Sequence, residues 1–86
     1  MKLKKEFLVH IAEPESFLVP TGAAAFSGLV RGNATFGRLL ELLREPVSEA
    51  GLMAALREEF DADEDVIAAD VKKALTALRS IGALDE

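Results

Sequence analysis

The chain has one histidine, His10, and this is the side chain best suited to act as a general base. Nucleophilic catalysis needs such a base beside an activated hydroxyl, thiol or amine. His10 falls in a predicted strand. Phe7, Val9 and Ile11 lie on one face of this strand, and His10 lies on the other face with Leu8. The sequence places no nucleophile next to it in a recognisable pattern. We therefore expect a structural or solvent-facing histidine and no enzymatic activity.

Three alternating aspartates are the second group that could do chemistry, by holding a metal ion. Asp61, Asp63 and Asp65 have the spacing that opens a calcium-binding loop. The sixth residue of that loop should be glycine and the twelfth glutamate, but these positions hold Val66 and Lys72. The chain also has no cysteine, which excludes thiolate metal sites, disulfides and thiol nucleophiles. The sequence therefore predicts no metal and no cofactor.

Length, composition and charge narrow the class of protein. With 86 residues, half of them hydrophobic, the chain is expected to fold as a single domain over residues 1–86. No apolar stretch approaches the roughly 20 residues that span a bilayer. The basic start is followed by only a short apolar run before Glu13 and Pro14, so a secretory signal is rejected and a cytoplasmic location is expected. The net charge of −5 argues against a nucleic-acid partner.

The pattern of apolar residues predicts three short strands followed by three helices. The strands are expected at residues 7–12, 16–19 and 27–31, and the helices at residues 35–44, 48–60 and 64–81. Strands this short and this close in sequence pair most easily as an antiparallel meander. The predicted fold is α+β, with a three-stranded antiparallel sheet followed by three helices, similar to a winged helix-turn-helix.

Helix boundaries are marked by capping residues. Ser48 is a candidate N-cap for the second helix, and Asp63 for the third. Pro46 is expected to end the first helix, because the residue before a proline disfavours helical geometry. Gly82 is placed where a left-handed C-cap would end the last helix.

A winged-helix DNA-binding regulator is one alternative for this fold. A helix that enters the major groove needs basic residues near its N-terminal end. Here that end carries Asp63, Glu64 and Asp65, which would repel phosphates. The basic residues Lys72, Lys73 and Arg79 come later in the helix, so DNA binding is the weaker interpretation.

Three segments of the chain resemble the PqqD family in order and spacing. The passage from Gly32 through Leu43 resembles its transition from strand to first helix. The stretch from Ser48 to Asp61 resembles its second helix, and Asp70 to Leu84 its last helix and close. One departure is the loop Glu45-Pro46-Val47 before the second helix, in place of a frequent Asp-Gly turn.

The resemblance implies a leader-peptide recognition element, which is a peptide-binding domain and not an enzyme. Such domains capture the leader segment of a ribosomally made precursor peptide by strand addition and present it to a modifying enzyme, commonly a radical SAM enzyme. In this chain the peptide would lie between the third strand and the third helix.

The residues at those two elements give a candidate site. An unpaired edge at Ser27 to Arg31 would offer main-chain hydrogen bonds to a peptide. On the last helix, Ala68, Lys72, Leu75 and Arg79 recur at helical spacing and form a second stripe beside the apolar stripe expected to face the core. The predicted peptide-binding residues are Ser27, Leu29, Val30, Arg31, Ala68, Lys72, Leu75 and Arg79.

Two points stay open on sequence alone. The opposite flank of the last helix, which includes Val66, Asp70, Lys73 and Ala77, is the rival peptide-facing surface. The strand edge could instead pair with a second copy, which would make the chain a small homodimerisation module.

Overall fold

The computed structural model describes residues 1–22 and 28–86. Its strands are β1 (Lys2–Leu3), β2 (Phe7–Ala12), β3 (Glu15–Pro20), β4 (Val30–Gly32) and β5 (Leu84–Asp85). Its helices are α1 (Ala34–Leu42), α2 (Glu49–Glu59) and α3 (Glu64–Ser80). The predicted α+β order of strands and then helices is confirmed over the described part of the chain.

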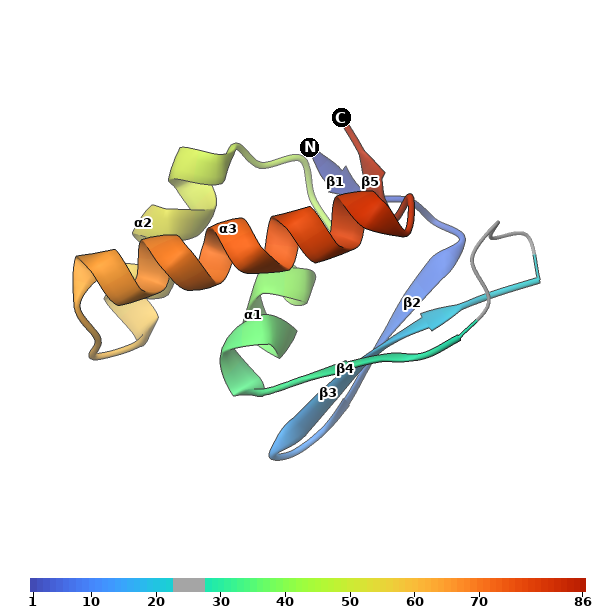
Figure 1. Ribbon diagram of the computed structural model, residues 1–86, viewed down its shortest axis with the longest axis horizontal. Coiled ribbons are helices and arrows are strands. Elements are labelled where there is room, and N and C mark those ends of the chain that lie inside the picture. The colour runs from blue at the N-terminus through green and yellow to red at the C-terminus, as the bar shows by residue number, and fades with distance from the viewer. Residues whose placement is uncertain (23–27) are drawn as a thin grey trace.

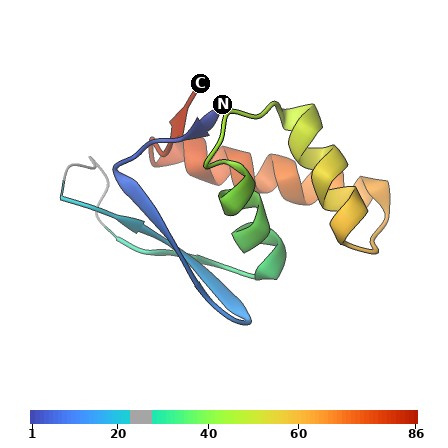
Figure 2. The same ribbon diagram turned by 180° about the vertical axis from the view of Figure 1, so that it is seen from behind.

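The main sheet is antiparallel, with the strand order β2-β3-β4. β2 and β3 form a hairpin in which Ala12 pairs with Glu15. Phe7 and Leu18 point into the core, whereas Leu8 and His10 are exposed on the other face. The alternation that predicted these two faces is therefore confirmed. The helices gather on one side of this sheet (Figures 1 and 2).

The core joins the inner face of the sheet to one side of each helix. Leu18 from the sheet, Leu40 from α1, Leu56 from α2 and Leu75 from α3 are all completely buried. Burial of each such leucine contributes about 1.5–3 kcal/mol. Packing of this kind, with no disulfide, fixes the positions of the helices against the sheet.

Capping explains where the helices begin and end. Asn33 accepts a hydrogen bond from the Phe36 amide at 2.9 Å, and Ser48 accepts one from the Gly51 amide at 3.0 Å. The Ser48 cap is as predicted. Asp63 occupies the N-cap position of α3 but makes no side-chain cap bond. Gly82 ends α3 with a φ of 71°, a conformation that glycine adopts without steric cost.

The largest differences from the sequence-based bounds are at the start of the third strand and the end of the first helix; the other ends differ by one residue or agree. The third strand of the sheet begins at Val30, so Leu29 precedes it, and Ser27 lies outside the described residues. α1 ends at Leu42 and not at residue 44, with the Leu43 amide still donating to the Leu39 carbonyl at 3.1 Å. The helix thus ends before the region that Pro46 restricts.

The pairing of β1 with β5 was not predicted. Leu3 lies opposite Leu84, and both side chains are buried. The Leu3 amide also donates to the Leu43 carbonyl at 2.8 Å, and the Lys4 amide to the Ala83 carbonyl at 2.9 Å. This second, two-stranded sheet joins the two ends of the described chain at the C-terminal end of α3 (Figure 1).

Candidate functional site

β4 is an edge strand of the described sheet. It pairs with β3 through Val30 opposite Leu18, Arg31 opposite Phe17, and Gly32 opposite Ser16. In the part of the chain that the structure describes, no strand pairs with its other side. An edge of this kind leaves main-chain donors and acceptors that can accept another extended segment.

A groove of about 310 Å³ lies beside β4, between this strand, α1 and α3. Its apolar lining residues are Val30, Phe36, Leu39, Leu56, Val71, Ala74 and Ala77. Its polar lining residues are Arg31, Asn33, Thr35, Asp70 and Lys73, with Gly32 completing the wall. The arrangement suits an extended peptide whose apolar side chains alternate toward the floor.

Small residues shape this groove. On α3, Ala74 and Ala77 face it, and their short side chains leave space between the helix and β4. At the other wall, a Cβ added to Gly32 would lie 2.3 Å from the Phe36 ring. The phenyl ring can therefore lie directly against the β4 backbone only because residue 32 has no side chain.

The charged groups of the groove come from two elements. Lys73 and Asp70 are exposed on α3, and Arg31 is exposed on β4. Arg31 also forms an ion pair with Glu15 at 3.2 Å, which reduces its effective charge. Lys73 makes no ion pair within the described residues, so it is the cation best placed to meet an acidic group in the groove.

Only two of the predicted peptide-binding residues line the groove, namely Val30 and Arg31. Leu29 is 59% exposed and lies just before β4, and Ser27 is not described. On α3, the groove is lined by three residues of the rival flank, Asp70, Lys73 and Ala77, together with Val71 and Ala74. Ala68, Lys72, Leu75 and Arg79 do not line this groove, and their role in peptide binding stays a prediction.

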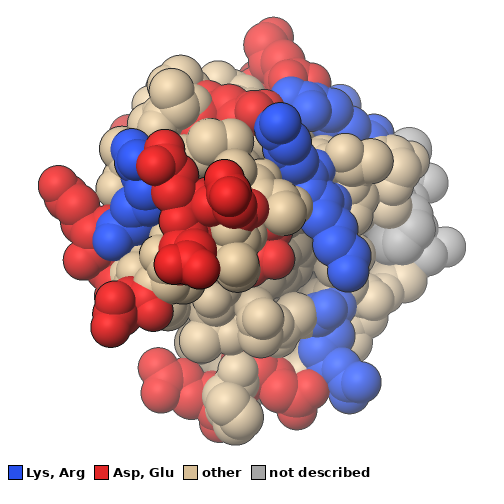
Figure 3. Space-filling model, turned by 60° about the vertical axis from the view of Figure 1, so that its left-hand side comes forward, with Lys and Arg blue, Asp and Glu red and all other residues tan. Residues whose placement is uncertain are grey.

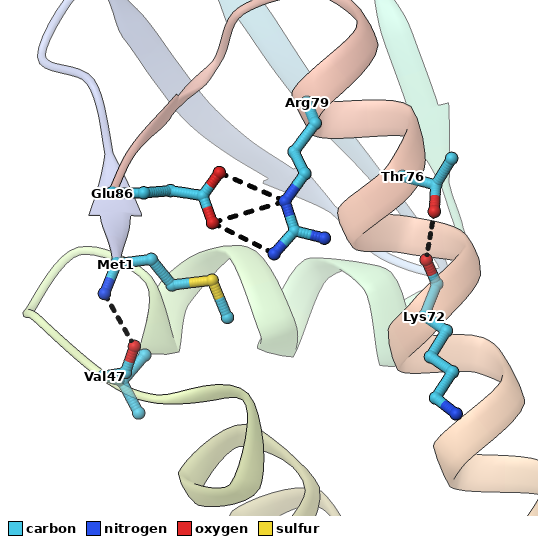
Figure 4. A network of polar contacts seen from close by, with 6 residues as sticks. All are labelled: Met1, Val47, Lys72, Thr76, Arg79 and Glu86. Carbon is cyan, nitrogen blue, oxygen red and sulfur yellow. Dashed lines mark hydrogen bonds and ion pairs between the residues drawn. The ribbon is translucent and has the colours of Figure 1, made fainter.

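Three of these four α3 residues have other contacts or surroundings in the structure. Leu75 is completely buried in the core. Arg79 forms an exposed ion pair with Glu86 at 3.0 Å, which raises the pKa of Arg79 and lowers that of Glu86 (Figure 4). Lys72 accepts a hydrogen bond at its backbone carbonyl from the Thr76 hydroxyl at 2.8 Å (Figure 4). The predicted stripe therefore includes both exposed residues and the buried Leu75. The side of α3 that faces β4 is the one that carries Lys73 and Ala77.

Surface charge is unevenly distributed. Figure 3 shows a column of Lys and Arg down the right of one face, with groups of Asp and Glu mainly to its left and at the bottom. The N-terminal end of α3 carries Glu64 and Asp65 in its first turn. A helix that reads DNA would need cations at that end.

His10 and the acidic side chains are the groups that could support catalysis or hold a metal ion. Among the described residues, no cluster of three or more His, Asp or Glu side chains could hold such an ion. His10 lies on the exposed face of β2, with its ring 6.1 Å from that of Phe17 and tilted by 36°. No helix within residues 1–22 and 28–86 is long and apolar enough to cross a membrane.

The fold and groove together define an α+β, winged-helix-like domain with an open sheet edge facing a helix. The family model of coenzyme PQQ synthesis protein D (PqqD) matches residues 13–84. The chain therefore belongs to the PqqD family, as the resemblance implied.

A solved structure shares this fold over almost all of both chains. It is described as TbiB1 in complex with the TbiA(beta) leader peptide. The two chains are 20% identical, with a TM-score of 0.73 and coverage of 99% of this chain and 100% of the other. No curated protein matches the sequence.

Proposed function

We propose that the protein is an adaptor that binds the leader segment of a ribosomally made precursor peptide. The leader adds as a strand along the free edge of β4, and its side chains enter the groove between β4 and α3. The observation that carries this proposal is the open edge of Val30–Gly32 directly beside an apolar groove of about 310 Å³. Strand addition supplies affinity through main-chain bonds, and the groove supplies selectivity.

The comparisons support this proposal. The match to the PqqD family extends over residues 13–84, which include both β4 and α3, the two walls of the groove. TbiB1, whose fold is similar along the whole chain, is described in complex with a leader peptide. A protein with the same fold can thus hold the kind of ligand that we propose here.

The adaptor presents the bound leader to a separate modifying enzyme, and we propose a radical SAM enzyme in that role. The resemblance to the PqqD family is the basis for this partner. The adaptor itself then needs no catalytic residue and no cofactor. In an assay that contains precursor and modifying enzyme, modification is expected to depend on addition of the adaptor.

The groove also indicates which leader side chains it selects. Ala74 and Ala77 leave space for a large apolar side chain on a floor that includes Phe36. Lys73 favours an acidic leader residue nearby, because a cation at the rim attracts an anion and repels a second cation. The preferred leader therefore has an apolar residue close to an acidic one.

Two adjacent lysines on α3 test which flank faces the leader. Lys73 lines the groove and Lys72 does not, although both are exposed. We expect Lys73→Glu to weaken leader binding about five- to tenfold, since reversal replaces an attraction of up to about 1 kcal/mol with a repulsion. Lys72→Glu makes the same change in net charge and is expected to bind within about twofold of the wild type.

The measurement is fluorescence anisotropy with a labelled leader peptide, taken from a short precursor reading frame beside the gene. Both variants are compared at the same ionic strength, because salt screens these charges. Stronger loss in Lys72→Glu than in Lys73→Glu would contradict the assignment of the groove flank.

A further inference from the structure

A second hollow lies on the other flank of α1 from the groove. It has a volume of about 290 Å³ and is formed by the β2–β3 turn, α1 and the C-terminal end of α2. Its lining residues are Ile11, Glu13, Pro14, Glu15, Ser16, Ala34, Gly37, Arg38, Glu41, Glu59 and Phe60. We call it the hairpin hollow. It shares no lining residue with the groove beside β4.

The floor of the hairpin hollow is apolar and accessible. Ile11 is 39% exposed, one of four large hydrophobic side chains in the described residues that are exposed to this degree. Phe60 is half-buried beside it, and Pro14 is exposed. Together these side chains give the hollow an apolar floor that an apolar side chain of a partner can cover.

Gly37 keeps this floor open. A Cβ added there would lie 2.7 Å from the Ser16 Cβ and 3.0 Å from Cδ1 of Ile11. α1 therefore lies close against β3 at this position, and Ile11 retains its place at the surface. Ser16 is itself buried, and its hydroxyl donates to the Asn33 carbonyl at 2.7 Å.

The rim of the hairpin hollow is negative. Four glutamates line it against a single arginine, Arg38. Glu59 pairs with Arg38 at 2.7 Å, and Glu15 pairs with Arg31 at 3.2 Å. The hydrogen bond that Arg38 donates to Glu59 raises the pKa of Arg38, and the charges of Glu59 and Glu41 raise it further. Arg38 is thus already engaged by the acids around it.

Two of the four glutamates are not part of an ion pair in the described residues, although Glu41 lies near enough to Arg38 to raise its pKa. Glu13 and Glu41 are exposed and make no ion pair within the described residues. They lie on different elements, one on the hairpin turn and one on α1, and both border the hollow. A partner that brings cations to this rim would gain electrostatic complementarity on both sides of the apolar floor.

We propose that the hairpin hollow is a second docking site, which binds a partner protein through an apolar side chain flanked by lysine or arginine. The apolar side chain covers Ile11 and Phe60, and the flanking cations meet Glu13 and Glu41. The groove beside β4 has a cation, Lys73, at its rim and selects the opposite charge. Because the two surfaces lie on opposite flanks of α1, a leader and this partner can bind at the same time.

A pair of synthetic peptides of opposite charge tests the proposal. One carries Lys-Leu-Lys and the other Glu-Leu-Glu, with blocked ends and identical flanking glycines. Added to the ¹⁵N-labelled full chain, the Lys-Leu-Lys peptide is expected to shift the amides of Ile11, Gly37 and Glu41. The Glu-Leu-Glu peptide is expected to leave them unchanged at the same concentration.

Matched charge variants separate the hollow from general attraction to an acidic protein. Glu13→Gln/Glu41→Gln is expected to weaken Lys-Leu-Lys binding about fivefold. Glu45→Gln/Glu58→Gln removes the same charge at exposed positions outside the hollow and is expected to bind like the wild type. Ile11→Thr, which keeps a β-branched residue in the strand, is expected to weaken binding without loss of the fold, as checked by circular dichroism.

Three results would overturn the proposal. These are equal shifts with both peptides, equal loss in both double variants, or unchanged binding in folded Ile11→Thr. Leader binding is measured separately, from the amide shifts of Val30 and Ala77. A negative result at the hairpin hollow can therefore be told apart from a negative result for the adaptor function.

Discussion

Replacement of Ala77 by tryptophan is expected to weaken leader binding at least about 100-fold. Ala77 lines the groove opposite β4, where its methyl group leaves the space that the leader would occupy. An indole there would fill the space and prevent side chains of the added strand from reaching the floor. A 100-fold loss corresponds to about 2.7 kcal/mol, the size associated with a principal contact of an interface.

Ala69→Trp is the matched control for this experiment. Ala69 is exposed on the same helix and does not line the groove. The Ala69→Trp variant has the same increase in side-chain size and is expected to bind the leader within about twofold of the wild-type affinity. Anisotropy titrations measure both affinities, and circular dichroism confirms that both variants are folded. Wild-type affinity in a folded Ala77→Trp variant would contradict the proposed binding groove.

Replacement of Leu75 by aspartate is expected to unfold the chain. Leu75 is completely buried. Leu→Ala changes in cores cost about 2–5 kcal/mol, and an unpaired buried carboxylate costs more than a small apolar side chain. Domains of this size are stabilised by only about 4–13 kcal/mol. Thermal or urea denaturation followed by circular dichroism is expected to show no cooperative transition.

Val66→Asp introduces the same charge on the same helix and serves as the control. Val66 is 50% exposed in the first turn of α3, where the helix dipole favours an acid. The free energy of unfolding of the Val66→Asp variant is expected to stay within about 0.5 kcal/mol of the wild-type value. A cooperatively folded Leu75→Asp variant would show that α3 packs with a different face toward the core.

Local sequence patterns predicted most of the secondary structure. Alternation in β2 and apolar spacing in α2 and α3 depend on neighbouring residues, so they can be read directly from the sequence. The pairing of Leu3 with Leu84 could not be found in this way. Strands of two residues have no periodicity, and their partners here are separated by almost the whole chain.

The open edge could be predicted from sequence, but the face of α3 could not. Val30 and Arg31 were identified because the resemblance to the PqqD family places the leader beside the third strand, whose edge was expected to be unpaired. On α3, Lys72 and Lys73 are adjacent, and both flanks mix small, apolar and charged residues. Which flank faces β4 depends on how α3 is rotated against the core, and that rotation is set by residues from several elements.

The central claim is that the leader adds to β4 and lies in the groove against α3. The most direct test is titration of the ¹⁵N-labelled protein with the unlabelled leader peptide, followed by amide shifts and hydrogen exchange. We predict shifts at Val30, Arg31 and Ala77, with slower exchange in β4 as its free edge becomes hydrogen-bonded. Saturable binding that leaves the amides of β4 and Ala77 unchanged would contradict this account.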